Sequence, residues 1–128
     1  MQVAIEISPG ELFDRLTILE IKAQRVSDPE KLRNVKLELD LLSQVRDREL
    51  KNRAELVGLV GELRVVNETL WKVEDDIRDC ERAKQFDARF IELARSVYRL
   101  NDQRAALKRK INVAVGSKIV EEKSYQPY

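Results

Sequence analysis

Apolar residues recur every three or four positions along the segment that follows Ser8, and this spacing places them on one side of a helix. Ser8, Pro9 and Glu11 form the start signal of such a helix, because serine caps the first turn, proline suits its first position and glutamate completes a capping box. We therefore predict a first helix from about Pro9 to Val26. Its apolar side carries Leu12, Leu16, Leu19 and Ala23.

A second start signal, Ser27-Asp28-Pro29-Glu30, ends the first helix and begins a new helical segment. Two apolar stripes follow, separated by the stretch 43–55, which carries seven charges and has little to bury. The second stripe has the alternating three-and-four spacing of a coiled-coil seam. The first stripe is Leu32, Val35, Leu39 and Leu42, and the second is Leu56, Leu59, Leu63, Val66, Leu70, Val73 and Ile77.

Two structures fit the charged stretch: one continuous helix from Pro29 to about Lys84, or a break near residues 46–53. Helix propensity favours the continuous helix, because the stretch is rich in good helix formers and contains no proline. We therefore predict one long central helix, with a shorter helix packed antiparallel against each half.

The last predicted helix runs from Ala88 to about Ala114, with Asp87 as its N-cap and Gly116 just beyond its end. The alternation within 3–7 predicts a short strand, and the tail either pairs with it as a second strand or is a mobile segment. The fold class is thus all-α: an elongated antiparallel helical bundle in a single domain, 1–128. Its parts are an extended segment 1–8, a bundle 9–114 and a tail 115–128.

The composition excludes several classes of function. Lys plus Arg number 24 against 23 for Asp plus Glu, so a net charge of +1 does not predict nucleic-acid binding. The chain contains no histidine, which excludes histidine-based catalysis and histidine-containing zinc sites. Cys80 is the only cysteine, and neither a signal peptide nor a membrane span is present. We therefore expect a cytoplasmic protein.

A polar stripe runs beside the coiled-coil seam and contains the only tryptophan. Its residues are Asn67, Trp71, Glu74, Arg78 and Glu81. If the chain folds back at Asp87, polar residues of the last helix face this stripe, and Arg95 lies near Asp76 of the preceding helix. A ligand site could then form between the last two helices. The alternative is an ordinary solvated face, with Glu74 and Arg78 as an i,i+4 ion pair. The candidate ligand-binding residues are Asn67, Trp71, Glu74, Asp75, Arg78, Arg95, Tyr98, Asn101 and Asp102.

No motif identifies a catalytic residue, a metal site or a cofactor. The acidic cluster Glu74-Asp75-Asp76 lacks the paired Glu-x-x-Glu arrangement of helical nucleotide pyrophosphohydrolases, and there is no glycine-rich phosphate loop. The sequence therefore favours a protein that is not an enzyme, without metal or cofactor.

Several long strings resemble a small bacterial family, catalogued as domain of unknown function 6165, over nearly the whole chain. The resemblance supplies no activity. It implies a bacterial source and genes near those for surface-polysaccharide synthesis, and it gives the ligand-site interpretation as much weight as the solvated face. The strings are Ser8–Leu12, Leu16–Lys22, Leu70-Trp71, Glu74–Arg78, Phe90–Tyr98, Asn101-Asp102 and Glu121–Tyr125.

Two functions remain open at this point. The first is a non-catalytic interaction or adaptor protein that forms a homo-oligomer, in its simplest form a dimer. The long seam favours it, and so does a central helix whose face the other helices do not fully cover. The second is a small enzyme or a binder of a phosphorylated sugar or nucleotide, with its site between the last two helices.

Overall fold

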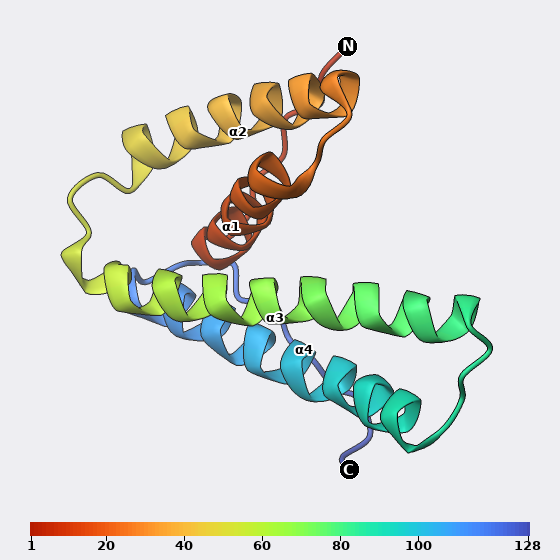
Figure 1. Ribbon diagram of the computed structural model, residues 1–128. Coiled ribbons are helices and arrows are strands. Elements are labelled where there is room, and N and C mark those ends of the chain that lie inside the picture. The colour runs from red at the N-terminus through yellow and green to blue at the C-terminus, as the bar shows by residue number, and fades with distance from the viewer.

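Four α-helices and one short 3₁₀-helix make up the regular structure of the chain, which a computed structural model describes over residues 1–128 (Figure 1). The all-α prediction is confirmed, and none of the helices combines the length and the apolarity needed to cross a membrane. The elements are α1 (Pro9–Arg25), α2 (Pro29–Glu49), η1 (Ala54–Leu56), α3 (Val57–Arg82) and α4 (Ala88–Ala114).

The predicted helix starts are confirmed by their hydrogen bonds. The Ser8 hydroxyl accepts from the Glu11 backbone N–H at 3.1 Å, and the carboxylates of Asp28 and Asp87 cap α2 and α4 in the same way. After α4, Gly116 adopts a φ of +66°, the left-handed conformation that commonly ends a helix. The capping residues therefore set three of the helix starts.

The continuous helix predicted from Pro29 to Lys84 is wrong, and the alternative break is present. α2 ends at Glu49, and the chain turns through Asn52, whose φ is +60°. This turn brings Leu56 into the core at 2% exposure, whereas the charged stretch 43–55 offers little apolar surface that a straight helix would bury. Packing has overridden helix propensity here.

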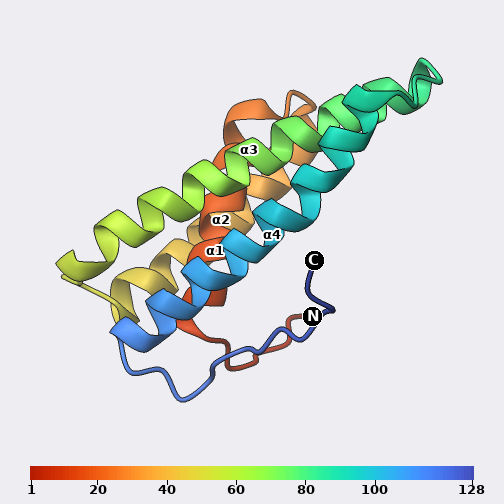
Figure 2. The same cartoon turned by 90° about the horizontal axis from the view of Figure 1, so that it is seen from below.

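The helices form two hairpins, α1–α2 and α3–α4, and α1 packs against the α3–α4 hairpin (Figure 1). α2 and α3 diverge from the turn at 50–53, and α1 lies between them. α1 packs against α2, α3 and α4, whereas α2 packs against α1 alone. Seen from below, the α3–α4 hairpin extends beyond the other two helices at its 83–87 turn (Figure 2).

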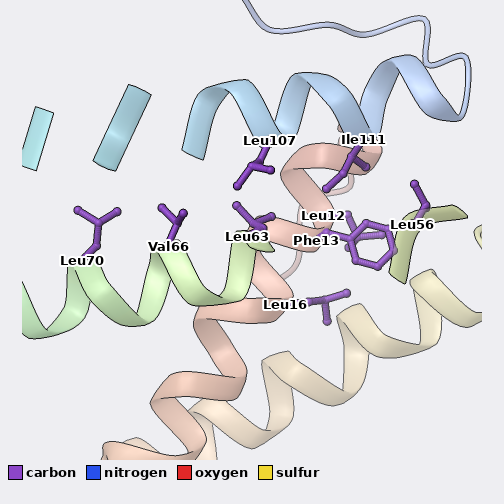
Figure 3. Close-up of a cluster of buried hydrophobic side chains, with 9 residues drawn as sticks. All are labelled: Leu12, Phe13, Leu16, Leu56, Leu63, Val66, Leu70, Leu107 and Ile111. Carbon is purple, nitrogen blue, oxygen red and sulfur yellow. The ribbon is translucent and has the colours of Figure 1, made fainter. Parts of the chain in front are cut away.

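The core forms where α1 meets the α3–α4 hairpin (Figure 3). α2 contributes no residue to this cluster, and none of its residues is fully buried. α1 is thus the central element of the fold, in place of the long helix that we predicted. The nine buried residues are Leu12, Phe13, Leu16, Leu56, Leu63, Val66, Leu70, Leu107 and Ile111.

The terminal segments contain no strand, so the predicted strand at 3–7 is wrong. Val3 is 77% exposed and Ile5 is 70% exposed, because no sheet edge is present to pair with this segment. The tail 115–128 leaves α4 and returns along it without regular secondary structure, close to the N-terminal segment (Figure 2).

Candidate functional site

The predicted polar stripe on α3 is divided between the interior and the surface. Asn67 is 5% exposed and Trp71 is half-buried. Glu74 and Arg78 form an i,i+4 ion pair on the exposed side of α3, and Asp75 is exposed beside them. The stripe therefore does not present its residues together to one ligand.

Asn67 belongs to a buried polar network that joins α3 to α1. Its Nδ2 donates to Asp14 Oδ1 at 3.0 Å and to Thr17 Oγ1 at 2.9 Å. Asp14 and Thr17 are each 1% exposed, and the Thr17 hydroxyl donates to the Asp14 carbonyl at 2.9 Å. Asn67 thus satisfies buried acceptors of a neighbouring helix.

α4 supplies the cations that neutralise Asp14. Arg104 donates to both carboxylate oxygens, with Nε 2.9 Å from Oδ1 and Nη2 2.5 Å from Oδ2, and Lys108 Nζ lies 3.8 Å from Oδ2. The hydrogen bonds to Asp14 raise the pKa of Arg104 despite its partial burial. Lys108 also donates to Glu11 at 2.6 Å. Burial acts to raise the pKa of Glu11, but the hydrogen bonds from Lys108 and Arg15 outweigh it and lower the pKa.

The site residues predicted from the sequence do not include Asp14, Arg104 or Lys108. One signal was present: Arg104 interrupts the apolar stripe of α4, at a position where a leucine or valine would continue it. A charged residue at a core position requires a buried partner of opposite charge. That partner is Asp14, which is 90 residues away in the sequence.

Arg95 does not reach the acidic residues of α3 as the predicted fold-back required. It pairs along its own helix with Glu92 at 3.2 Å, whereas Asp76 pairs with Lys72 at 3.1 Å and lies 4.0 Å from Arg89. The predicted contact between Asp76 and Arg95 is therefore absent.

Three of the predicted residues, Tyr98, Asn101 and Asp102, do come together, on the side of α4 that faces the tail. They line a groove of about 1150 Å³ between α4 and residues 121–128. A second hollow of about 560 Å³ lies between α3 and α4, and it is lined by none of the predicted residues. The groove under the tail is thus the concave site nearest to the prediction.

Aromatic rings and ion pairs hold the tail over this groove. All three tyrosines of the chain line it, and the rings of Tyr98 and Tyr128 are 4.7 Å apart. Lys123 Nζ lies 2.6 Å from Asp102 Oδ1, and hydrogen bonds from Lys123 and Tyr128 lower the pKa of Asp102. Tyr125 also lines the groove.

Every cation that lines the groove is paired with a carboxylate. Arg104 is held by Asp14, and Lys108 by Glu11. The other two pairs are Arg109 with Glu122 and Lys123 with Asp102. An anionic ligand would have to displace one of these carboxylates. No group of three or more Cys, Asp and Glu side chains converges in a way that could hold a metal ion.

The middle of the tail is anchored at the N-terminus of α1. Glu121 accepts from the Ser8 hydroxyl and, at 3.0 Å, from Asn112 Nδ2, and the Asn112 Oδ1 accepts from the Gly10 backbone N–H at 2.7 Å. Partial burial of Glu121 acts to raise its pKa, but the hydrogen bond from Ser8 and those from its other partners lower it. This anchor joins the tail, α1 and α4.

A different kind of surface lies on α2. Its side opposite α1 exposes Leu37 at 62% and Leu41 at 42%.

The whole chain exposes 9062 Å², whereas a folded monomeric protein of 14.9 kDa exposes about 7,000 Å². The exposed terminal segments and α2, which packs against only one helix, both contribute to this exposed surface.

Comparison with known proteins agrees with the resemblance seen in the sequence. The model of a family described as "Family of unknown function (DUF6165)" matches residues 2–128. No curated protein and no solved structure matches the chain.

Proposed function

The chain belongs to DUF6165, a family of unknown function, and we propose that it is a non-catalytic helical interaction protein that assembles as a homo-oligomer, in its simplest form a dimer. The observation that carries the proposal is the exposed surface of 9062 Å². The excess over a monomer of this mass is about 2,000 Å², and a standard interface removes about 800 Å² from each partner. One interface of ordinary size therefore fits within the excess.

The burial of α2 supports the same proposal. A helix of 21 residues with several leucines normally buries one side completely, yet α2 has no buried residue. Its single neighbour, α1, leaves the opposite side open to another chain. A second copy would complete the packing of α2.

The polar clusters support a structural role over a catalytic one. The buried network of Asp14, Asn67 and Arg104 is saturated, and no buried side-chain nitrogen or oxygen lacks a hydrogen-bond partner. Its polar groups are bound to one another across α1, α3 and α4, which is the arrangement of a structural network. We also propose a cytoplasmic location, which the lone buried thiol of Cys80 supports. The family resemblance supports an adaptor role near bacterial surface-polysaccharide synthesis.

Binding of a phosphorylated sugar or nucleotide is the second candidate function, and the groove under the tail favours it. Its volume suits such a ligand, and Tyr98, Tyr125 and Tyr128 offer flat surfaces for a ring. Because the four cations of the groove are already paired, the geometry supports this function less than self-association.

One thermal experiment separates the two candidates. If the chain is an oligomer, its melting temperature rises with protein concentration, because association stabilises the folded state by mass action. If it is a ligand binder and a monomer, the melting temperature is independent of protein concentration and rises with a glucose 1-phosphate, UDP-glucose or ATP titration. We expect the first result, and the second would overturn the proposed function.

A further inference from the structure

The side of α2 that faces away from α1 carries a second regular stripe. Its members follow each other at intervals of four, three, four, three and four residues, which is the spacing of a coiled-coil seam. Every member is exposed, and the residues of the opposite side, which face α1, are half-buried. The stripe consists of Glu30, Asn34, Leu37, Leu41, Gln44 and Arg48.

We propose that a second copy of the chain docks on this stripe, with the two α2 helices antiparallel about a two-fold axis at the level of residue 39, midway between Leu37 and Leu41. The inference rests on the proposed homo-oligomer and names the surface that forms it. The helix is open along this side, because α2 packs against α1 alone and lies at the outer edge of the fold (Figure 1).

In the antiparallel arrangement, each residue of the stripe meets a residue of matching chemistry on the partner helix. A two-fold axis at position 39 places Leu37 against Leu41 of the partner subunit, which gives two leucine layers at the centre. The next layer places Asn34 against the partner's Gln44, and side-chain amides both donate and accept hydrogen bonds. The central leucines therefore bury apolar surface, and the amides fix the register.

Charge selects the antiparallel direction. The outermost layer places Glu30 against the partner's Arg48 at both ends of the helix pair, so opposite charges meet twice. A parallel pair in register would instead place Glu30 against its own copy and Arg48 against its own copy. Arg48 is exposed at 67% and has only a neighbouring partner, Glu49, so it is free to turn toward a second chain. Like charges in the parallel pair oppose that arrangement.

The other exposed apolar residues do not form a comparable stripe. Val57 and Val65 lie on α3, Phe86 lies in the 83–87 turn, and Ile91 and Val113 lie at opposite ends of α4. Single apolar side chains of this kind are normal on a protein surface. α2 is thus the surface that combines regular spacing with a missing neighbour.

A charge exchange tests the arrangement. Glu30 and Arg48 are separated by about 27 Å along one helix, so they cannot contact each other within one chain. We expect Glu30→Arg alone, and Arg48→Glu alone, to raise the dimer dissociation constant about tenfold, measured by sedimentation equilibrium. The double variant Glu30→Arg/Arg48→Glu should restore the wild-type value. The double variant still has a positive charge at position 30, so any effect of that charge within its own helix persists. Restoration can therefore arise only from the contact between chains.

A second pair of variants locates the interface independently of charge. Leu37→Glu places a carboxylate in the centre of the proposed helix pair and should give a folded monomer. Val65→Glu is the matched control, because Val65 is also 62% exposed but lies on α3, and it should leave the dimer intact. Circular dichroism establishes that both variants fold.

The outcomes distinguish the surface from the function that it serves. If the wild type is a monomer at all concentrations, both proposals are overturned. If the wild type is a dimer and Leu37→Glu remains one, self-association stands and the α2 surface is wrong. If Leu37→Glu dissociates the dimer but the charge exchange fails to restore it, the antiparallel register is wrong. The proposal is supported in full if Leu37→Glu dissociates the dimer, Val65→Glu leaves it intact, and the charge exchange restores the wild-type dissociation constant.

Discussion

Arg104 of α4 holds the fully buried carboxylate of Asp14 on α1 through two hydrogen bonds, at 2.9 and 2.5 Å. Asn67 of α3 donates to the same carboxylate. One side chain of α1 is therefore bound by both helices of the α3–α4 hairpin. The docking of α1 onto that hairpin depends on this network as well as on the apolar core.

Removal of Arg104 should be strongly destabilising. Arg104→Ala leaves Asp14 buried without its main counter-charge, which costs on the order of 3 kcal/mol of unfolding free energy. Arg78→Ala is the control, because Arg78 is 67% exposed and pairs with Glu74 along one helix turn, a pair worth about 0.5 kcal/mol or less. Urea unfolding measures both changes. Equal losses in the two variants would contradict the role given to Asp14.

Gly10 marks the closest approach of α1 to α4. A Cβ at this position would lie 2.4 Å from the Lys108 carbonyl oxygen, so Gly10→Ala must push the two backbones apart. We expect it to lower the unfolding free energy by about 1 to 3 kcal/mol. Gly61→Ala, in the interior of α3, meets no atom within 4 Å and should raise it by up to about 1 kcal/mol. If Gly10→Ala has the same melting temperature as the wild type, the close approach is not required.

Stability should decrease in acid through two carboxylates, Glu11 beside Lys108 and Glu121 in the tail anchor. The pKa values of Glu11 and Glu121 are lowered in the folded chain from an ordinary value of 4.5. Each group therefore contributes stability that is fully present above pH 4.5 and is lost as the pH falls through its folded-state pKa. The unfolding free energy should decrease below about pH 4.5, and less steeply in Glu121→Gln. The exposed Glu62, which forms no ion pair, provides the control variant Glu62→Gln. An identical slope in wild type and Glu121→Gln would contradict the anchor.

The helices could be predicted from local signals, whereas their connection could not. Ser8, Asp28 and Asp87 act through hydrogen bonds to residues two or three positions ahead, so a sequence window contains the whole interaction. The turn at Asn52 has no such local cause, because its neighbours are good helix formers. It depends on the burial of Leu56 against residues of α1 and α4 that are distant in the sequence.

The candidate site followed the same division. Tyr98, Asn101 and Asp102 were predicted because a fold-back at Asp87 brings their side of α4 toward the polar stripe of α3. Their actual neighbours, Lys123 and Tyr128, belong to a tail without periodicity, so no spacing rule could place them there. Asn67 was assigned to a ligand for its polarity, although its partners are Asp14 and Thr17 of a distant helix.

The mass of the chain in solution tests the central claim most directly. Light scattering coupled to size-exclusion chromatography should give at least twice the chain mass of 14.9 kDa at micromolar concentration, because one protomer leaves α2 packed on a single side. A mass of 14.9 kDa that persists as the concentration is raised to the millimolar range would contradict it.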